Sequence, residues 1–166
     1  MKILHTSDWH VGKRIGRYDR SDEYRAVIAE VAAIAAAEDV DLVVHSGDLF
    51  DRPIPPIEAL NIGLGGLVTL SDHGRRPVVV IAGNHDSPGI FEALAPIVLE
   101  QNIHLRGTIN RPDEGGVIDL AKPAGRAVIS CFQLLREGRA YHEWEQTQKH
   151  NKKYADRLRA ISGAYN

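Results

Sequence analysis

The first half of the chain alternates short apolar runs with longer amphipathic stretches. Three runs have the length and composition of strands: Ile3–Leu4, Leu42–Val44 and Val78–Ile81. Between the first two, apolar residues recur at helical spacing from Tyr24 to Ala35, which predicts a helix of about 17 residues. Strand, helix and strand form a β-α-β unit, whose crossover we expect to be right-handed.

Two further helices follow from the same pattern. The pair Pro55-Pro56 suits the first turn of a helix, and an apolar stripe continues from Ile57 to Leu67. Three glycines in this stretch weaken a helix by up to ~1 kcal/mol each relative to alanine, which is tolerable where the helix packs closely; they are Gly63, Gly65 and Gly66. A third helix is expected after Pro88, over Ile90 to Gln101.

Beyond Ile103 the runs become shorter and are divided by Gly and Pro. They predict additional strands, expected to be antiparallel, at His104–Leu105, Val117–Leu120 and Ala127–Ser130. The stretch from Tyr141 to Ile161 is polar, with a narrow apolar face, and predicts one more helix. Since no linker or repeat divides the chain, the sequence predicts one α/β domain over residues 1–166.

The composition limits the class of protein and its cellular compartment. With 43% hydrophobic and 25% charged residues, the chain is typical of a globular protein. A single cysteine excludes an internal disulfide, and the amino terminus enters a strand without a leader segment, which favours the reducing cytoplasm. No apolar run approaches the ~20 residues of a membrane span. The formal charge of −2 gives no support for nucleic-acid binding through bulk electrostatics.

A polar motif follows each of the first three strand-like runs: Asp8-Trp9-His10, Gly47-Asp48-Leu49-Phe50-Asp51 and Gly83-Asn84-His85-Asp86. Ligands at the exits of neighbouring strands can converge on one point. Two divalent ions that clamp a phosphodiester need a carboxylate between them, and Asp48 is the natural bridge. Asp8 and His10, at i and i+2, can hold one ion, while Asn84 offers an amide oxygen to the other.

The residue types also indicate which metal and which chemistry. Carboxylate, imidazole and amide oxygen together suit Mn²⁺ and tolerate Fe²⁺ or Zn²⁺, whereas a structural zinc site would be expected to use thiolates. His85 is placed to touch the phosphate or protonate the leaving oxygen, and Asp86 could orient its ring. Trp9 either walls this site or fills the core. His5 and His45, inside strand-like runs, are expected to be hydrogen-bonded core residues.

With these motifs, the chain resembles the calcineurin-like metallophosphoesterases, and most closely the SbcD subunits of bacterial SbcCD nucleases, from Met1 to about Leu135. Phosphatases of the superfamily usually carry Gly-Asp-x-Val-Asp-Arg-Gly and Asn-His-Glu; here Leu49-Phe50 replaces x-Val, Pro53 follows Arg52, and Asp86 replaces Glu. The resemblance implies a four-layer αββα sandwich. It also assigns the roles: Asp8 and His10 on the first metal, Asp48 bridging, Asn84 on the second metal, and His85 as the catalytic histidine.

Relatives supply further metal-binding histidines from a later Gly-His-x-His element that is absent before Asn166. We therefore expect an amino-terminal fragment of the domain, with an incomplete sandwich; His142 or His150 could replace the missing ligands only with a different spacing. The leading hypothesis is a Mn²⁺-dependent DNA exo- and endonuclease subunit of DNA repair and recombination. In the family, it is partnered by an SMC-type ATPase and forms a homodimer through helices in the Ile57–Leu99 region.

Two alternatives stay open at this point. One is a phosphodiesterase or phosphatase for small substrates, and the other is a catalytically incomplete scaffold that keeps the dimer or partner surface. Basic residues in the loop after the first motif bear on the nuclease hypothesis, because such a loop could follow a phosphate backbone or could simply be solvated. They are Lys13, Arg14, Arg17 and Arg20.

Overall fold

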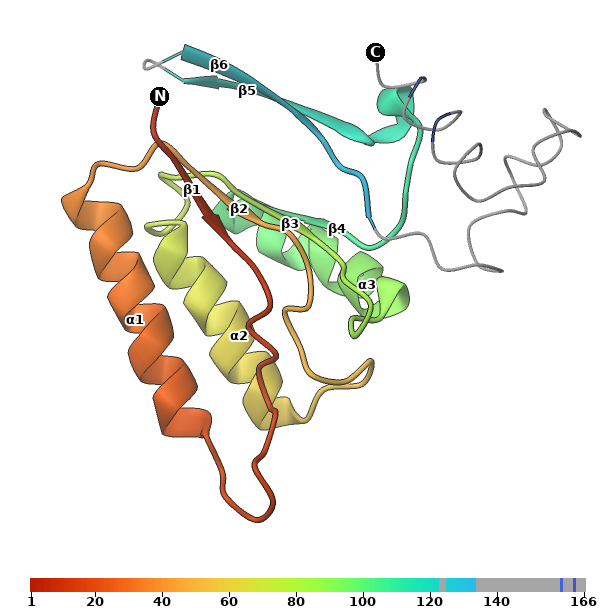
Figure 1. Cartoon of the computed structure of the whole chain (residues 1–166). Helices are drawn as coiled ribbons and strands as arrows, with labels where there is room; N and C mark the ends of the chain where they lie inside the picture. Colours follow the sequence, from red (N-terminus) through yellow and green to blue (C-terminus); the bar gives the residue numbers. More distant parts are fainter. Residues whose placement is uncertain (123–124, 134–158, 160–162, 164–166) are drawn as a thin grey trace, which may run out of the picture.

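The computed structural model describes residues 1–122, 125–133, 159 and 163. Four parallel strands form a sheet in the order β1-β2-β3-β4 (Figure 1). The strands are β1 (Ile3–Thr6), β2 (Leu42–His45), β3 (Val78–Ile81) and β4 (Ile103–Arg106). They are joined in turn by α1 (Ser21–Ala37), by α2 (Ile57–Leu70), and by α3 (Pro88–Val98) with the 3-10 turn η1 (Leu99–Gln101).

The predicted strands and helices of the first hundred residues are confirmed, with one error beyond them. The run His104–Leu105 was expected to be antiparallel, yet β4 pairs parallel with β3, with Val79 opposite His104. The cause is the crossover, because α3 and η1 return the chain to the same end of the sheet, as parallel pairing requires. The helix predicted from Tyr141 to Ile161 lies outside the described residues, apart from Arg159.

A two-stranded antiparallel hairpin follows β4, as predicted from the last apolar runs. After the 3-10 turn η2 (Pro112–Glu114), strands β5 (Val117–Lys122) and β6 (Gly125–Ser130) pair with each other. Arg126 forms an ion pair with Asp119 across the hairpin, with Nε 2.7 Å from Oδ1. Figure 1 shows that the hairpin lies apart from the helices.

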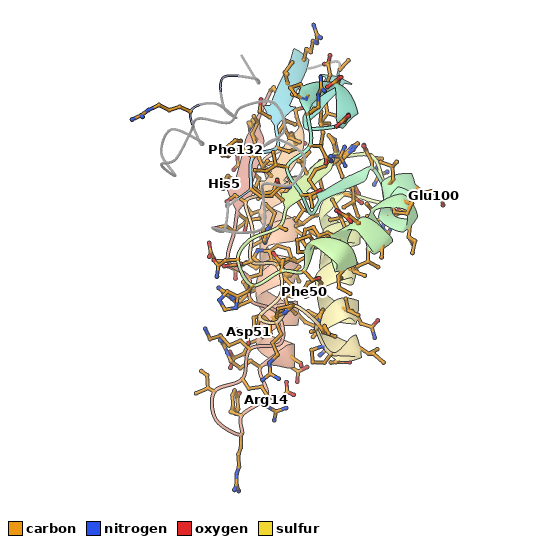
Figure 2. The ribbon with its side chains drawn as sticks, turned by 90° about the vertical axis from the view of Figure 1, so that its right-hand side faces the viewer. His5, Arg14, Phe50, Asp51, Glu100 and Phe132 are labelled. Carbon is orange, nitrogen blue, oxygen red and sulfur yellow. The ribbon has the colours of Figure 1, made fainter. Side chains whose placement is uncertain are left out.

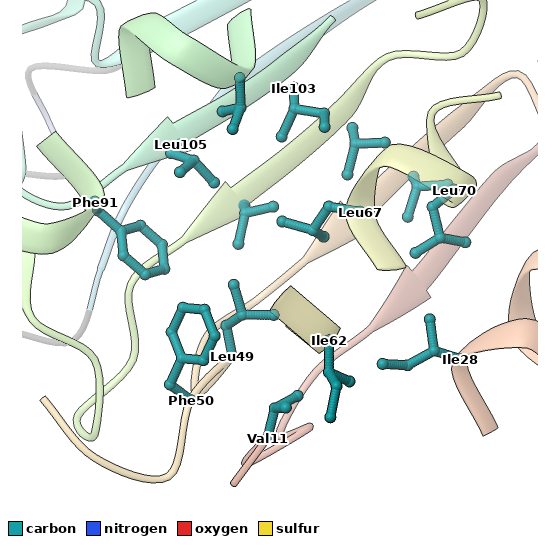
Figure 3. Close-up of a cluster of buried hydrophobic side chains, with 14 of the residues drawn as sticks. Val11, Ile28, Leu49, Phe50, Ile62, Leu67, Leu70, Phe91, Ile103 and Leu105 are labelled. Carbon is teal, nitrogen blue, oxygen red and sulfur yellow. The ribbon is translucent and has the colours of Figure 1, made fainter. Parts of the chain in front are cut away.

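The two faces of the parallel sheet are covered differently. Alternate strand residues such as Val43, Val80 and Leu105 belong to the main core, where they pack with residues of all three helices (Figure 3). The intervening residues Leu42 and Val79 pack with Ile118 of β5 and with other hairpin residues in a smaller cluster. The order of layers is therefore helices, parallel sheet, hairpin.

The glycines of α2 permit close packing, as the sequence led us to expect. A Cβ on Gly63 would lie 2.7 Å from the Phe50 ring, and one on Gly66 would lie 2.7 Å from Ile28 of α1. Gly65 faces open space and has no such contact. Two of the three glycines thus bring α2 against α1 and against the loop after β2, the loop that carries Asp48.

One arginine ties together the ends of the helices that lie far from this loop. The Arg76 guanidinium donates hydrogen bonds to the carbonyl oxygens of Val40 (2.7 Å), Leu70 (2.9 Å) and Ala35 (3.2 Å). Helix carbonyls near a carboxyl end are otherwise unpaired, and they interact favourably with a cation.

Within the described residues, no helix is long and apolar enough to cross a bilayer.

Candidate metal centre

The loops that follow β1 and β2 run side by side and extend the pairing of the two strands. The amides of Asp8, His10 and Val11 donate to the carbonyls of Gly47 (2.9 Å), Asp48 (2.9 Å) and Leu49 (3.0 Å). Asp8, His10 and Asp48 have φ values of 55°, 47° and 54°. Few non-glycine residues adopt this left-handed conformation, and such residues cluster at functional sites. The loops therefore hold these three side chains in an unusual backbone geometry.

Two motif glycines bring the third loop against the second. Gly47, with φ of +115°, has no room for a Cβ, which would lie 2.8 Å from Cα of Gly83. A Cβ on Gly83 would lie 2.7 Å from Cγ of Asp48, and closer still to its Oδ1 and amide nitrogen. Gly47 and Gly83 therefore allow the second and third loops to approach each other closely. This close approach fixes the position of the Asp48 carboxylate.

Asp8, His10 and Asp48, all predicted as metal ligands, converge. The Nε2 of His10 lies 3.9 Å from Oδ1 of Asp8 and 3.8 Å from Oδ2 of Asp48, and one potential ligand atom of each residue falls within 4.8 Å of the others. These distances are too long for hydrogen bonds. They fit ligands that each lie about 2.1 Å from a common ion, and the donor set suits a divalent cation.

A second group shares His10. One potential ligand atom each of His10, Asp51 and His85 also lie within 4.8 Å of one another. The Nδ1 of His10 is buried, has no hydrogen-bond partner among the described residues, and lies 3.8 Å from Oδ1 of Asp51. Asp51 has no role in the sequence-based prediction: its position in the second motif was visible, but not the direction of its side chain. Figure 2 shows Asp51 beyond Phe50, toward the end of the molecule where Arg14 lies.

His85 is held by its backbone and by its ring. Its amide donates to Oδ1 of Asp48 (2.7 Å), and its Nδ1 lies 2.9 Å from the carbonyl oxygen of Asp51. Because a carbonyl only accepts, Nδ1 carries the hydrogen and Nε2 is left as the acceptor, or as the donor once protonated. The His85 ring meets the His10 ring edge-on, with centroids 4.7 Å apart. The predicted catalytic histidine thus adjoins the predicted metal ligands.

Asp86 does not orient the His85 ring, contrary to the prediction. Its buried carboxylate accepts hydrogen bonds from the amides of Leu49 (3.1 Å), Phe50 (2.9 Å) and Gly83 (2.8 Å). Burial raises the pKa of Asp86, although the three amide hydrogen bonds act in the opposite direction. Asp86 therefore ties the second and third loops together, and the Asp51 carbonyl orients the ring in its place.

Comparison with known proteins identifies the family. Residues 1–160 match the calcineurin-like phosphoesterases. The chain belongs to this family. It is 45% identical over 107 residues to the SbcD subunit of the nuclease SbcCD of Bacillus subtilis, an alignment that covers 64% of the chain and 27% of that protein.

Two other relatives extend the comparison. The SbcD subunit of the Rhodobacter capsulatus nuclease SbcCD is 37% identical over 147 residues, which cover 82% of the chain and 36% of the relative. The DNA double-strand break repair protein Mre11 of Sulfurisphaera tokodaii is 38% identical over 113 residues, or 68% of the chain and 29% of the relative. The chain thus spans about a quarter to a third of the length of these proteins.

Asn84 and Trp9, two further predicted residues, lie on the loops of the centre. Asn84 is exposed on the third loop, between Gly83 and His85, and its metal-binding role stays a prediction. Trp9 is half-buried, packs against the main core and donates from Nε1 to Oγ1 of Thr6 (2.8 Å), which favours the core interpretation. His142 and His150 lie outside the described residues.

The two strand histidines differ from each other. His45 is buried at 1% exposure, as predicted, and burial lowers its pKa to about 4. Its Nδ1 accepts from the amide of Gly47 at 3.4 Å, while its Nε2 finds no hydrogen-bond partner in the part of the chain that the structure describes. His5 was expected in the core but is exposed, with Nε2 2.8 Å from Oγ of Ser46. His5 lies on β1, an edge strand of the sheet that the described residues form.

Proposed function

We propose that the chain forms the catalytic part of a Mn²⁺-dependent DNA nuclease that hydrolyses phosphodiester bonds with two metal ions. In this proposal Asp8 and His10 would hold the first ion, Asn84 would hold the second, and Asp48 would be the ligand shared by both. The observation that carries the proposal is the convergence of Asp8, His10 and Asp48, whose potential ligand atoms lie within 4.8 Å of one another. The names of the relatives, nuclease subunits and break-repair proteins, support DNA as the substrate.

The chain's own residues have separable tasks in this reaction. Ions bound at the centre supply Lewis acidity and a water of lowered pKa. Asp48 is fixed by the His85 amide at Oδ1, which leaves Oδ2 toward His10. His85, with Nδ1 held by the Asp51 carbonyl, presents Nε2 to contact the phosphate or to donate a proton to the leaving oxygen. Asp86 keeps the two loops in register.

The charge of the centre supports a cation-dependent reaction. Asp8, Asp48 and Asp51 contribute carboxylates to the two groups, and His10 and His85 contribute imidazoles. Without a cation, three carboxylates at this separation would repel a phosphodiester, whereas bound divalent ions would attract it. We therefore propose that metal binding precedes productive substrate binding.

The proposal also covers the partners and the oligomeric state of the whole protein. By the family resemblance, we propose an SMC-type ATPase partner, a cytoplasmic location and a homodimer. Ile57, the first residue of α2, is 78% exposed, Ile54 in the loop before it is 81% exposed, and Ile97 of α3 is 67% exposed. Apolar surface is therefore available on and beside the two helices concerned. A monomer mass that stays constant with concentration in sedimentation would contradict the dimer.

The function is tested by hydrolysis of linear and hairpin DNA, and of a chromogenic bis-aryl phosphodiester, with and without Mn²⁺. His85→Ala should lower the rate at least ~100-fold, because a positioned acid or base contributes about that much, while Mn²⁺ still binds. His73→Ala removes an exposed histidine from the turn after α2 and should change nothing. Equal rates for wild type and His85→Ala would refute the proposed mechanism.

The pattern of substrates decides between the alternatives. Hydrolysis of the chromogenic diester without cleavage of DNA would favour a small-substrate phosphodiesterase. Mn²⁺ binding without hydrolysis of either substrate would favour the scaffold. The proposed nuclease requires His85-dependent cleavage of DNA.

A further inference from the structure

A tight turn projects from the chain between the metal centre and α1; residues Lys13–Tyr18 are called the basic turn below. Ile15 and Tyr18 pair across it through two backbone hydrogen bonds, N to O, of 3.3 and 3.0 Å. Gly16, with φ of +59°, provides the reversal. Arg14 braces the turn, because it donates to the Arg17 carbonyl (2.9 Å) and lies 3.3 Å from the Asp19 carboxylate.

The base of the basic turn is fixed relative to His10. The Lys13 amide donates to the His10 carbonyl (3.0 Å), and the Tyr24 hydroxyl lies 3.3 Å from the Lys13 carbonyl oxygen. In Figure 2, Arg14 lies beyond Asp51 at the same end of the molecule. The basic turn therefore holds a defined position next to the metal centre.

The basic turn exposes apolar and cationic groups together. Ile15 is 64% and Tyr18 60% exposed, and residues paired across an antiparallel bridge place their side chains on the same face. Lys13 and Arg17 are exposed and, among the described residues, form no ion pair. Arg20 is different from these cations, because it pairs with Glu23 (2.7 Å) and lies over the Tyr24 ring.

An exposed aromatic ring beside unpaired cations matches the chemistry of a single nucleic-acid strand. Bases stack on aromatic side chains, and phosphates bind Lys and Arg. Stacking needs a base whose face is open, as in a single strand or at a strand end, whereas bases inside a duplex already stack on each other.

We propose that the basic turn binds the single-stranded end of the nucleic acid that is cleaved at the metal centre. Tyr18, supported by Ile15, stacks on an open base, and Lys13 and Arg17 bind the backbone phosphates. The inference rests on the proposed function and specifies which part of the substrate lies next to the reacting phosphodiester.

The test measures binding of a fluorescein-labelled single-stranded oligonucleotide by anisotropy at several salt concentrations. Mn²⁺ is present, and every chain carries His85→Ala so that cleavage is suppressed; His85→Ala alone is the reference chain, wild type at the basic turn. Tyr18→Ala should weaken binding at least ~5-fold with an unchanged salt slope, and Tyr18→Phe should bind within about 2-fold of the reference chain, because stacking needs only the ring. Lys13→Gln with Arg17→Gln should reduce the slope of log K against log salt by about 1.4, or 0.7 for each phosphate contact.

Arg75→Gln is the matched control for lost charge, because Arg75 pairs with Asp72 near the start of β3, at the other end of the sheet. It should change neither the affinity nor the slope. Unfolding midpoints show whether each variant is folded. If Tyr18→Ala does not fold, Tyr18→Phe still tests the inference, because a loss of affinity in a variant that keeps the aromatic ring would contradict stacking.

The failure of this inference can be told apart from the failure of the proposed function. Affinity and salt slope equal to the reference chain in all variants, or no binding by the Mn²⁺-loaded reference chain, would overturn the role of the basic turn, even with Mn²⁺-dependent hydrolysis of the chromogenic diester by the wild-type chain intact. Binding that depends on Tyr18, without hydrolysis of either substrate, would support the turn and refute the nuclease. Equal affinity for blunt duplex and single strand would also overturn the inference.

Discussion

Substitution of Gly83 by alanine tests how the centre is held in place. The new Cβ would lie 2.7 Å from Cγ of Asp48, where ordinary contact begins at 3.4 Å, so the two loops must separate by at least about 0.7 Å. Metal–ligand distances tolerate only about 0.2 Å. The shift therefore exceeds this tolerance at least threefold, and it acts on the proposed bridging ligand.

We expect Gly83→Ala to remain folded, at a cost of about 1–3 kcal/mol for overpacking. Mn²⁺ binding, measured by calorimetry, should weaken strongly, and hydrolysis of the chromogenic diester should fall about 100-fold, the effect of a misplacement near 1 Å. Gly65→Ala is the control, because a Cβ at that position meets nothing within 4 Å. A folded Gly83→Ala variant with wild-type Mn²⁺ affinity would refute the idea that close approach of the two loops places the bridging carboxylate.

Three other predictions concern stability. The folded-state pKa of His45 is about 4 against an ordinary 6.5, so between these pH values the unfolded chain binds a proton that the folded chain does not. The free energy of unfolding, measured with urea, should therefore fall by about 3 kcal/mol as the pH drops from 6.5 to 4. In His45→Gln the fall should be smaller. Arg76→Gln should lose about 2–4 kcal/mol in the same assay at pH 7, because it removes charged hydrogen bonds to three carbonyls. Gly65→Ala should gain up to about 1 kcal/mol, whereas Gly66→Ala, whose Cβ would clash with Ile28, should lose about 1–3 kcal/mol.

Each of these has a contradicting outcome. The same acid sensitivity in His45→Gln as in wild type would assign the pH dependence to other groups, among them His104, whose pKa is also lowered by burial. Full stability of Arg76→Gln would mean that water replaces its hydrogen bonds. Equal effects of alanine at Gly65 and Gly66 would show that helix propensity, and not packing against α1, decides the cost.

The sequence predicts what depends on local pattern. Apolar periodicity located α1 and the strands that precede each motif, and the motif positions placed Asp8, His10 and Asp48 at neighbouring strand ends. The direction of β4 could not be read from the two-residue run His104–Leu105, because strand direction depends on the connection and not on the strand.

The errors at the centre come from loop geometry. Asp86 was assigned to His85 because the two are adjacent in sequence, yet its carboxylate turns to the amides of Leu49, Phe50 and Gly83. The side-chain direction of Asp51 was equally hidden, since the left-handed backbone at Asp48 breaks the alternation of a strand. Such reversals are set by contacts between loops that are distant in sequence.

The most direct test of the proposed metal centre is a Mn²⁺ titration of the wild-type chain, Asp48→Asn and His85→Ala, in which electron paramagnetic resonance detects the free ion. Hydrolysis of the chromogenic diester is measured on the same samples. We predict that Asp48→Asn loses Mn²⁺ binding and hydrolysis together, while His85→Ala keeps the metal and loses hydrolysis. Wild-type Mn²⁺ binding by Asp48→Asn would contradict the proposed centre, because the residue placed at the meeting point of the three loops would then hold no ion.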